Sequence, residues 1–333
     1  MLSKLFESLY LKVFVNIIVL RAKSVVYIET ANKKGIVDSV EESFNTTSLN
    51  DSMCDFILSY TSESPFNYIS ILDKSLSQGA APTCSSKEIS TYCDTSSSKH
   101  LCYGDKWSFY TSKLSLHAIE KEYSKTGVDF VFSPFVVLAR FFRDKIDINM
   151  AMFILVEDNF VTLSVFDNSV LLYAKHLDMQ HYKDSSDLLM DDEEEIELDI
   201  DDGIDLDSIE ADDLDDFGDI EDLDSLEDLD EFSDAKDLDE EFQESLDETV
   251  QVKEVDGFNE DYQRYLLIQS SINDFYKSTK YKSQFIESTY IADGVGVSGD
   301  LKRYLEEEMF LNVYIRSMDL GAEICELAKA ELK

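Results

Sequence analysis

The chain has 333 residues, of which 44% are hydrophobic, and its formal net charge is −41. This length allows two domains or one two-lobed domain with a substantial core, and we expect no nucleic-acid partner. The longest apolar run, residues 9–20, is shorter than the roughly 20 residues of a membrane-spanning helix and contains Lys12 and Asn16. No cleavage site of small residues follows this run, so we expect neither a transmembrane helix nor a signal peptide.

The first 72 residues predict three strands, a helix and a fourth strand. The strands are expected at residues 11–20, 23–30 and 35–44, and Asn32 to Gly35 form a hairpin turn between the last two. A helix is expected from about Ser48, because Ser48 and Asp51 form a possible capping pair and apolar residues then recur at helical spacing. Residues 66–72 read as the next strand.

Residues 74–106 form a polar insertion that is rich in serine and threonine. It contains Cys84, Cys93 and Cys102, and His100 lies beside the last of them. These four residues could form a zinc site, but their spacing is not that of recognised zinc motifs. Ordinary loop cysteines are therefore the preferred interpretation, and we expect no metal. Five cysteines, an odd number in a chain with a large core, indicate a reducing cytoplasm.

Regular structure is predicted again from Lys106. A strand at 106–112, a helix at 113–125 ended by Gly127, and a strand at 128–133 come first. Ser133 and Pro134 then begin a helix at 134–146, because serine is a good N-cap and proline suits the first helical position. Three strands at 150–158, 160–168 and 169–179 form a meander.

An acidic tract occupies residues 184–250. Between Asp184 and Glu248 there are 34 acidic residues and one lysine, so this tract carries −33 and leaves −8 for the rest of the chain. Apolar residues from Leu214 to Phe232 recur every third position, which places no continuous apolar face on a helix. We expect a disordered insertion. A solvated spacer, a docking segment for a basic partner and loose binding of cations are its three possible roles.

After the tract, residues 251–333 predict a long helix at 258–280, a strand at 285–293, a helix at 298–309, a strand at 312–317 and a final helix. The first strand and the next helix are joined by Gly294-Val-Gly296-Val-Ser298-Gly299, and Asp319 follows 20 residues later. That pattern is the fingerprint of a dinucleotide-binding domain. Only 14 residues follow Asp319, too few for the second half of such a domain, so a plain strand-to-helix turn is preferred.

The order of the predicted elements resembles the two-lobed actin-like ATPase superfamily, which has a ribonuclease H-like α/β fold with mixed sheets. Within it, residues 266–316 resemble the closing segment of the pilus-assembly protein PilM and of the cytoplasmic domain of the secretion protein GspL. The resemblance implies a first lobe at 1–150, which includes the insertion 74–106. It implies a second lobe at 151–183 and 251–333, interrupted by the acidic insertion 184–250.

Active members of that superfamily hold a nucleotide with three glycine-bearing turns. The first is an Asp-x-Gly turn, but residues 1–30 contain neither aspartate nor glycine. At the second turn this chain has Glu157, Asp158 and Asn159, and the two carboxylates would repel a phosphate. Only the third turn keeps its glycines, so Gly294, Gly296, Ser298 and Gly299 remain as candidates for a cofactor site. We expect no bound cofactor, although ATP with magnesium is possible.

The sequence therefore predicts a protein without enzymatic activity and without catalytic residues. By resemblance it is a cytoplasmic bacterial scaffold, at the inner membrane through its partners, in a type IV pilus, type II secretion or DNA-uptake machine. The implied partners are the tail of a PilN-like membrane protein and the secretion ATPase, with a basic partner possible for the acidic tract. The alternative is a nucleotide-binding actin-like ATPase or a filament-forming protein of cell division or cell shape.

Overall fold

The computed structural model describes residues 10–147, 149–179, 248–278, 284–297 and 299–332, and for 248–259 it describes the backbone alone. Two compact units are distinguished, one formed by Met1–Ser186 with Asp256–Lys333 and one by Asp187–Val255. We predict disorder for residues 184–250. Of these, residues 184–247 lie outside the described residues. Residues 248–250 belong to a helix.

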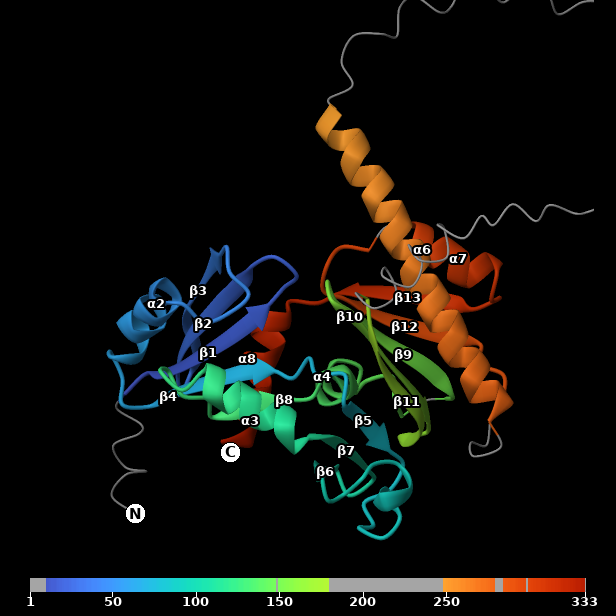
Figure 1. The fold of residues 1–333 in the computed structure, drawn as a ribbon, viewed down its shortest axis with the longest axis horizontal. Helices are drawn as coiled ribbons and strands as arrows, with labels where there is room; N and C mark the ends of the chain where they lie inside the picture. Colours follow the sequence, from blue (N-terminus) through green and yellow to red (C-terminus); the bar gives the residue numbers. More distant parts are fainter. Residues whose placement is uncertain (1–9, 148, 180–247, 279–283, 298, 333) are drawn as a thin grey trace, which may run out of the picture. The chain divides into compact units, whose positions relative to one another are not determined.

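The first lobe is built on a five-stranded sheet with the strand order β3-β2-β1-β4-β8 (Figure 1). Its strands are β1 (Lys12–Val19), β2 (Ser24–Asn32), β3 (Gly35–Phe44), β4 (Asn67–Leu72) and β8 (Phe130–Phe132). The first three are antiparallel, while β4 is parallel to β1 and β8 is parallel to β4. Six consecutive residues of β1 are buried, as expected for a central strand covered on both faces.

The second lobe is built on another five-stranded sheet with the order β11-β10-β9-β12-β13. Its strands are β9 (Ala151–Val156), β10 (Phe160–Asp167), β11 (Val170–Asp178), β12 (Ser288–Asp293) and β13 (Asn312–Ser317). Here too a three-stranded antiparallel meander is followed by two strands that extend the sheet in parallel from β9. The two sheets therefore have the same order and strand directions, and this repeated arrangement is the two-lobed actin-like fold.

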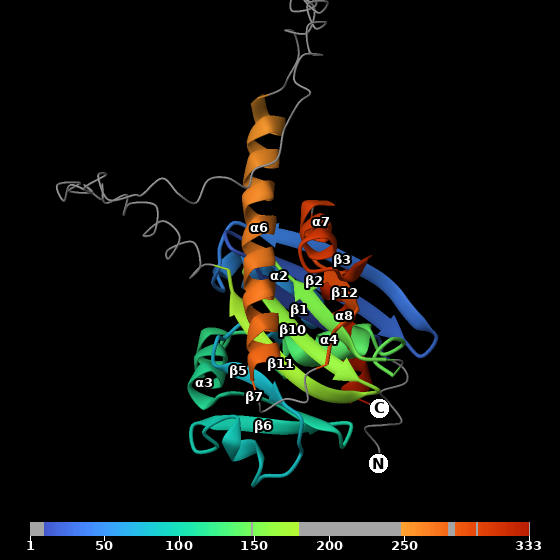
Figure 2. The same cartoon turned by 90° about the vertical axis from the view of Figure 1, so that its right-hand side faces the viewer.

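Helices cover the sheets, and the buried residues form three apolar clusters. One cluster packs α2 (Asp51–Thr61) on the first sheet, around Met53 and Ile57. A second packs the C-terminal half of α6 (Glu248–Lys277) and α7 (Gly299–Glu307) on the second sheet (Figure 2). The third and largest contains α4 (Pro134–Phe141) and α8 (Leu320–Glu331) with residues of both sheets, so it joins the two lobes.

The predicted starts of α3 (Lys113–Glu122) and α4 are confirmed, whereas α4 ends at Phe141 and not at Ile146, and α6 begins at Glu248, ten residues before its predicted start. Ser133 caps α4 by accepting a hydrogen bond from the Phe135 amide, with Pro134 at the first helical position, as predicted. The predicted cap of α2 is wrong: Asn50, not Ser48, accepts from the Met53 amide, at 2.9 Å. Asparagine is as good an N-cap as serine, so the sequence there offered two suitable residues two positions apart.

The polar insertion is more regular than the sequence indicated. It contains β5 (Gln78–Ala81), a short 3-10 turn (Ile89–Thr91) and β6 (Ser98–Tyr103). Together with β7 (Trp107–Ser112), which leads into α3 (Lys113–Glu122), these strands form a separate antiparallel sheet with the order β5-β7-β6. Trp107 lies almost fully buried in the large cluster and so anchors this sheet to the fold.

The expectation of free loop cysteines is wrong for two of the three residues, because Cys84 and Cys102 form a disulfide with a Cα–Cα distance of 5.3 Å. Cys84 follows β5 and Cys102 lies in β6, so the pairing of both strands with β7 brings them together. Cys93 is a half-buried free thiol. No group of three histidine, cysteine or acidic residues with metal-binding geometry occurs in the part of the chain that the structure describes. Within the same part, no helix is long and apolar enough to span a membrane.

A candidate functional site at three turns between the lobes

The three turns that hold a nucleotide in active actin-like proteins can be located in the structure. The first joins β1 to β2 and contains Arg21, and it is closed by a hydrogen bond from the Leu20 amide to the Lys23 carbonyl. The second joins β9 to β10 and contains Glu157 and Asp158. The third, the glycine loop, joins β12 to α7. Because β9 and β12 are parallel neighbours, the second and third turns lie side by side at the same end of the sheet.

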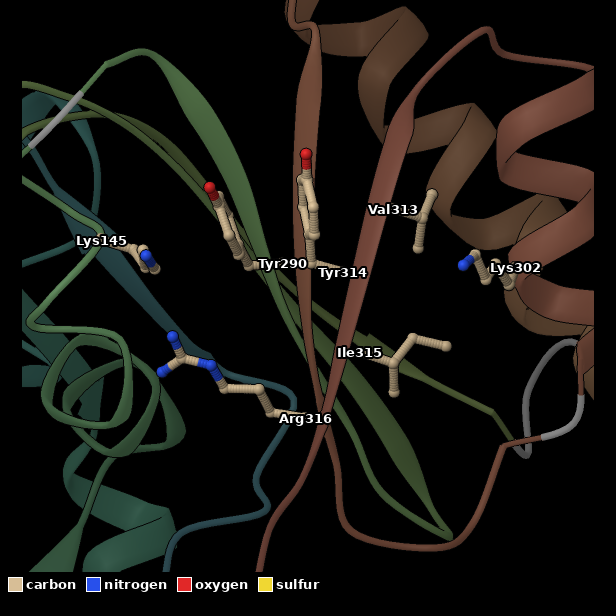
Figure 3. Close-up of a pocket in the computed structure, with 7 residues that line it drawn as sticks. All are labelled: Lys145, Tyr290, Lys302, Val313, Tyr314, Ile315 and Arg316. Carbon is tan, nitrogen blue, oxygen red and sulfur yellow. The ribbon is translucent and has the colours of Figure 1, made fainter.

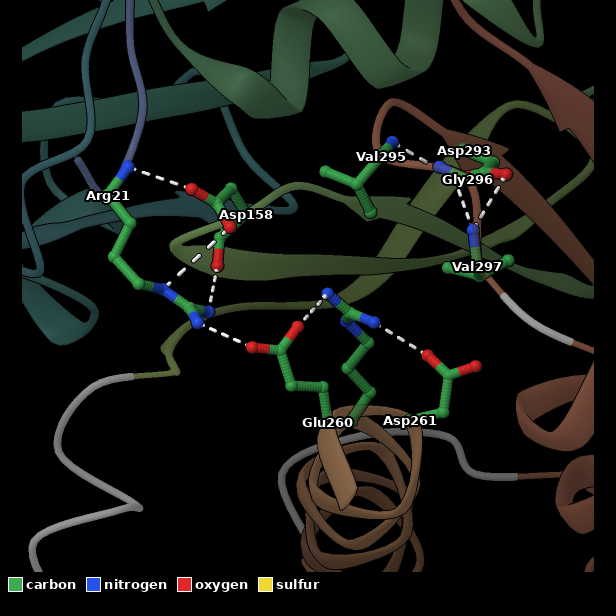
Figure 4. A network of polar contacts seen from close by, with 9 residues as sticks. Arg21, Asp158, Glu260, Asp261, Asp293, Val295, Gly296 and Val297 are labelled. Atoms are coloured by element: carbon green, nitrogen blue, oxygen red, sulfur yellow. Dashed lines mark hydrogen bonds and ion pairs between the residues drawn. The ribbon is translucent and has the colours of Figure 1, made fainter. Parts of the chain in front are cut away.

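Arg21 connects the first turn to the second. Its backbone amide donates to Asp158 Oδ2 at 2.8 Å, and its Nη2 donates to the Asp158 carbonyl at 2.5 Å. Its Nη1 donates to Glu260 Oε1 on α6, also at 2.5 Å (Figure 4). The guanidinium group therefore lies between the turns and ties the first lobe to two elements of the second. Such charge-assisted bonds are stronger than neutral ones.

The ion pairs continue along α6. Arg264 donates from Nη1 to Asp261 Oδ1 at 2.6 Å and from Nη2 to Glu260 Oε2 at 3.3 Å. Arg264 and Asp261 are both almost fully buried. A buried charge without its partner is strongly destabilising, so Arg264 and Asp261 stabilise each other. Arg264 also holds the carboxylate of Glu260, which accepts the hydrogen bond from Arg21.

In the glycine loop, a carboxylate of the chain occupies the backbone donors. Asp293, the last residue of β12, accepts hydrogen bonds from the amides of Val295, Gly296 and Val297 at 3.1, 2.7 and 3.1 Å (Figure 4). Successive amides of this kind form a concave site that binds anions such as phosphate. Here the anion is the Asp293 side chain, so these three donors are already used.

The glycines of this loop have steric explanations. A Cβ added to Gly294 would overlap the carboxylate of Glu157, which lies in the second turn. Gly296 has φ +79°, a left-handed conformation that glycine adopts without strain. Gly299 begins α7 with nothing near the position of a Cβ, and the predicted candidate Ser298 lies outside the described residues. Asp319 is the N-cap of α8, where it accepts from the Ala322 amide.

Glu157 of the second turn is a buried acid whose charge interacts with that of Lys74, a half-buried residue that follows β4. Burial raises the pKa of the Glu157 carboxyl to about 7, while the nearby Lys74 opposes that shift. Burial lowers the pKa of Lys74 to about 8, although Glu157 and Asp158 attract its positive charge. Clusters of shifted pKa values are common at functional sites, but structural ion pairs produce them too. Glu157 lies against Gly294, and Lys74 lies near two acids. We therefore assign Glu157 and Lys74 to the packing between the turns.

His176 on β11 is another buried polar residue near the second turn. Its Nδ1 lies 2.7 Å from the Thr162 hydroxyl, and its ring packs on Phe160 with centroids 4.8 Å apart. Burial lowers the pKa of His176 to about 4, despite the opposing effect of Asp73. The imidazole is therefore neutral at pH 7 and serves the packing of the second lobe.

Sequence reasoning brought the three turns together correctly but missed the residues that fill them. Arg21, Lys74, Glu260 and Asp293 were not singled out. An arginine in the first turn is visible in the sequence, but its partners are 137 and 239 positions away and depend on the fold. The candidates Gly294 and Gly296 do lie at the site, where they contact or shape the loop itself.

Comparison with known proteins gives two matches to protein families and several to solved structures. The sequence model of a family described as Domain of unknown function (DUF8341) matches residues 152–333. A second family, Domain of unknown function (DUF8569), matches residues 10–139. No curated protein matches the sequence.

Among solved structures, a Bacteroides thetaiotaomicron protein with an actin-like ATPase fold and unknown function is 12% identical, with a TM-score of 0.45, and the match covers 97% of this chain and 96% of that one. The PilM–PilN type IV pilus biogenesis complex is 9% identical, with a TM-score of 0.49 and coverage of 96% and 97%. The ethanolamine utilization protein EutJ from Carboxydothermus hydrogenoformans is 8% identical, with a TM-score of 0.40 and coverage of 95% and 87%. Such distant likenesses carry no information about function.

The first family model matches more than half of the length of this chain. This actin-like chain therefore belongs to the family described as Domain of unknown function (DUF8341).

Proposed function

We propose that this protein is a non-catalytic scaffold whose two lobes are held together by its own side chains where active relatives hold a nucleotide. The observation that carries the proposal is the position of Arg21, which bonds Asp158 and Glu260 across the lobes. Phosphate groups and magnesium would have to displace these ion pairs. They would also meet the carboxylates of Glu157, Asp158 and Asp293 in place of free backbone amides.

The proposed role is a part of a bacterial type IV pilus, type II secretion or DNA-uptake machine. The resemblance of residues 266–316 to PilM and to the GspL cytoplasmic domain supports this role. The proposed partners are the tail of a PilN-like membrane protein and the secretion ATPase of the same machine. The proposed location is the cytoplasm, at the inner membrane through these partners.

The disulfide bears on that location. Disulfides are rare in a reducing cytoplasm, where those that form are mostly transient. Cys102 lies in a strand of the small separate sheet and Cys84 follows another of its strands, so neither belongs to any of the three turns. We therefore also propose that the two lobes and the hydrogen bonds of Arg21 form whether Cys84 and Cys102 are oxidised or reduced.

Affinity capture with the full chain tests the proposed role. The protein is immobilised and exposed to detergent-solubilised membranes from the source bacterium, and retained proteins are identified by mass spectrometry with and without added ATP and magnesium. We expect enrichment of a pilus or secretion membrane protein, and the same amount with and without nucleotide. Failure to retain any component of such a machine contradicts the proposed machine, and release of the retained protein by ATP contradicts the nucleotide-independent scaffold.

For the acidic tract we propose a separate role as a tether for a basic partner. The tract carries −33 of the net charge of the chain, and attraction between exposed charges falls as salt rises. Deletion of residues 184–247 is expected to leave the thermal unfolding midpoint of the lobes unchanged and to reduce capture of that partner at low salt. Equal capture by the deleted and full chains at low salt contradicts this role.

A further inference from the structure

The open edge of the second sheet carries features of a binding site for an extended peptide. β13 is the last strand of this sheet, and it pairs only with β12 among the described residues. The Asn312 amide donates to the Glu287 carbonyl and the Met318 amide to the Asp293 carbonyl. In a parallel pair, both backbone groups of every second residue point to the neighbouring strand. The groups of Val313, Ile315 and Ser317 therefore point away from β12, toward the open edge.

The two faces of this edge differ in chemistry. On one face, Tyr314 is 52% exposed, and Arg316 and Lys145 lie beside it. On the other face are Val313, Ile315 and Lys302 of α7 (Figure 3). Together with Tyr290, these side chains line a hollow of about 620 Å³. Because the hollow includes residues from both faces, it follows the edge of the strand.

A row of stacked aromatic rings ends at this edge. Phe153, Tyr290 and Tyr314 are register partners on β9, β12 and β13. The ring centroids of Phe153 and Tyr290 are 5.4 Å apart with planes at 14°, and those of Tyr290 and Tyr314 are 5.1 Å apart with planes at 19°. The next strand in the sheet would place a side chain on the outer side of Tyr314. Aromatic cross-strand neighbours are among the most favourable at such positions.

Two residues further along the same face, the edge presents positive charge. Arg316 makes two bonds to the exposed Asp144, at 3.1 and 2.9 Å, and Lys145 is half-buried with no ion partner among the described residues. Lys302 on the opposite face pairs only at 3.7 Å with Glu306. Glu287 lines a smaller adjoining hollow and is the acidic residue there. Of these three basic residues, Arg316 and Lys302 already pair with an acid, and Lys145 is the one without an ion partner among the described residues.

We propose that the open edge of β13 binds an extended segment of another protein by strand addition. On the face of Tyr314 and Arg316, the segment carries an aromatic residue and an acidic residue two positions apart. Between them it carries an apolar residue that packs on Ile315. Backbone hydrogen bonds to Val313 and Ile315 supply affinity, and the alternating side chains supply specificity. The acidic residue pairs with Arg316 and Lys145. This inference does not depend on the machine that the protein serves.

A synthetic peptide tests the proposal directly on the full chain. The probe is a blocked peptide with the core Glu-Val-Tyr-Val-Glu, which presents an acid two residues from the tyrosine in either strand direction. Its control has the core Lys-Val-Tyr-Val-Lys. We expect saturable binding of the acidic peptide in fluorescence anisotropy, with no saturation by the basic one. Equal binding of both peptides, or binding of neither, overturns the proposal.

Variants of the protein locate the site. Arg316→Ala and Lys145→Ala are each expected to weaken binding about tenfold, because each removes a charge-assisted contact. Lys125→Ala removes an exposed lysine on the first lobe that, like Arg316, pairs with an aspartate, so it changes net charge equally and is expected to leave binding unchanged. Tyr314→Ser weakens binding, whereas Leu114→Ser, at an exposed apolar residue on α3, does not. Similar losses in the control variants contradict the assignment.

Hydrogen exchange separates strand addition from loose electrostatic attraction. Without peptide, we expect slow exchange at the amides of Tyr314 and Arg316, which point to β12, and fast exchange at those of Ile315 and Ser317, which point to the open edge. Bound peptide is expected to slow exchange at Ile315 at least tenfold. Unchanged exchange at Ile315 in the saturated complex overturns strand addition.

A second copy of the chain is the other possible occupant of this edge, and sedimentation of the protein alone tests it. We expect no dimer that depends on Tyr314. A dimer that dissociates in Tyr314→Ser would assign the edge to a second copy and overturn the proposal.

Discussion

Arg21 and Asp158, which lie 137 positions apart in the chain, are joined by one hydrogen bond from a backbone amide and one from a guanidinium group. Each residue lies in a turn that an active actin-like protein uses to bind a phosphate. Their direct contact means that the two lobes meet through protein groups at the place where a nucleotide would otherwise connect them. Glu260 completes the contact from α6.

The first prediction concerns the strength of that connection. Arg21→Ala and Glu260→Ala, alone and together, form a double-mutant cycle, and we expect a coupling energy of about 1 kcal/mol because both side chains are more than two-thirds buried. The measurement is urea unfolding at pH 7. The matched control is the cycle of Lys125 and Asp51, an ion pair exposed to solvent, where the coupling is expected to be much smaller. Equal coupling in the two cycles would show that the Arg21 contact does not hold the lobes together.

The second prediction concerns the reason for the glycine at position 294. Gly294→Ala is expected to destabilise the nucleotide-free protein by about 1 to 3 kcal/mol, because the new methyl group overlaps the Glu157 carboxylate. In a Glu157→Ala background the same change is expected to cost much less. Chemical denaturation of the four proteins measures both effects.

Gly299→Ala is the control for this series. Nothing lies within 4 Å of the position of its Cβ, and alanine favours a helix more than glycine does, so the stability should be unchanged or slightly higher. If Gly294→Ala is also neutral, the glycine is not required for packing. That outcome would restore the alternative explanation, close approach of the loop to a ligand.

The third prediction concerns pH. The pKa of His176 is lowered by burial from its ordinary 6.5 to about 4, so the unfolded chain binds its proton at a higher pH than the folded one. The contribution of His176 to stability is therefore complete above pH 6.5 and is lost as the pH falls from 6.5 toward 4. It amounts to about 3 kcal/mol across this range. His176→Gln should flatten that part of the stability profile, whereas His117→Gln, at an exposed histidine, should not. An unchanged profile in His176→Gln would place the acid sensitivity elsewhere.

The fourth prediction concerns the insertion. Protein denatured without reductant should release three titratable thiols, those of Cys54, Cys93 and Cys325. Replacing both Cys84 and Cys102 by serine should reduce the free energy of unfolding by about 3 kcal/mol, because the crosslink restricts the unfolded chain. Cys93→Ser is the control and should cost little. Five titratable thiols in the purified protein would show that the pair stays reduced.

The sequence predicted the order of strands and helices in both lobes, because each element there has a clear pattern. β9 is a continuous apolar run, and α4 begins with a serine cap and a proline. β5 and β6 were missed because their residues are small or polar and lack the alternation of a half-buried strand. The disulfide between Cys84 and Cys102 was missed for the same reason, since it depends on how these strands pair.

The sequence indicated the candidate site by the glycines that two of its turns lack and by Gly294, Gly296, Ser298 and Gly299 in the third. The absence of an Asp-x-Gly turn before Thr30 is visible in the sequence, whereas the contacts of Arg21 with Asp158 and Glu260 exist only once the lobes are folded. The same holds for Asp293, whose carboxylate accepts from three amides because the loop curls around it. Local sequence shows which residues are present at a turn, and the fold decides which groups face each other.

Titration calorimetry of the full chain with ATP and magnesium tests the central claim most directly. If Arg21, Glu157 and Asp293 fill the place of a nucleotide, no saturable heat is expected up to millimolar ATP. A titration with one site per chain and a dissociation constant in the micromolar range would contradict the account and favour a working actin-like ATPase.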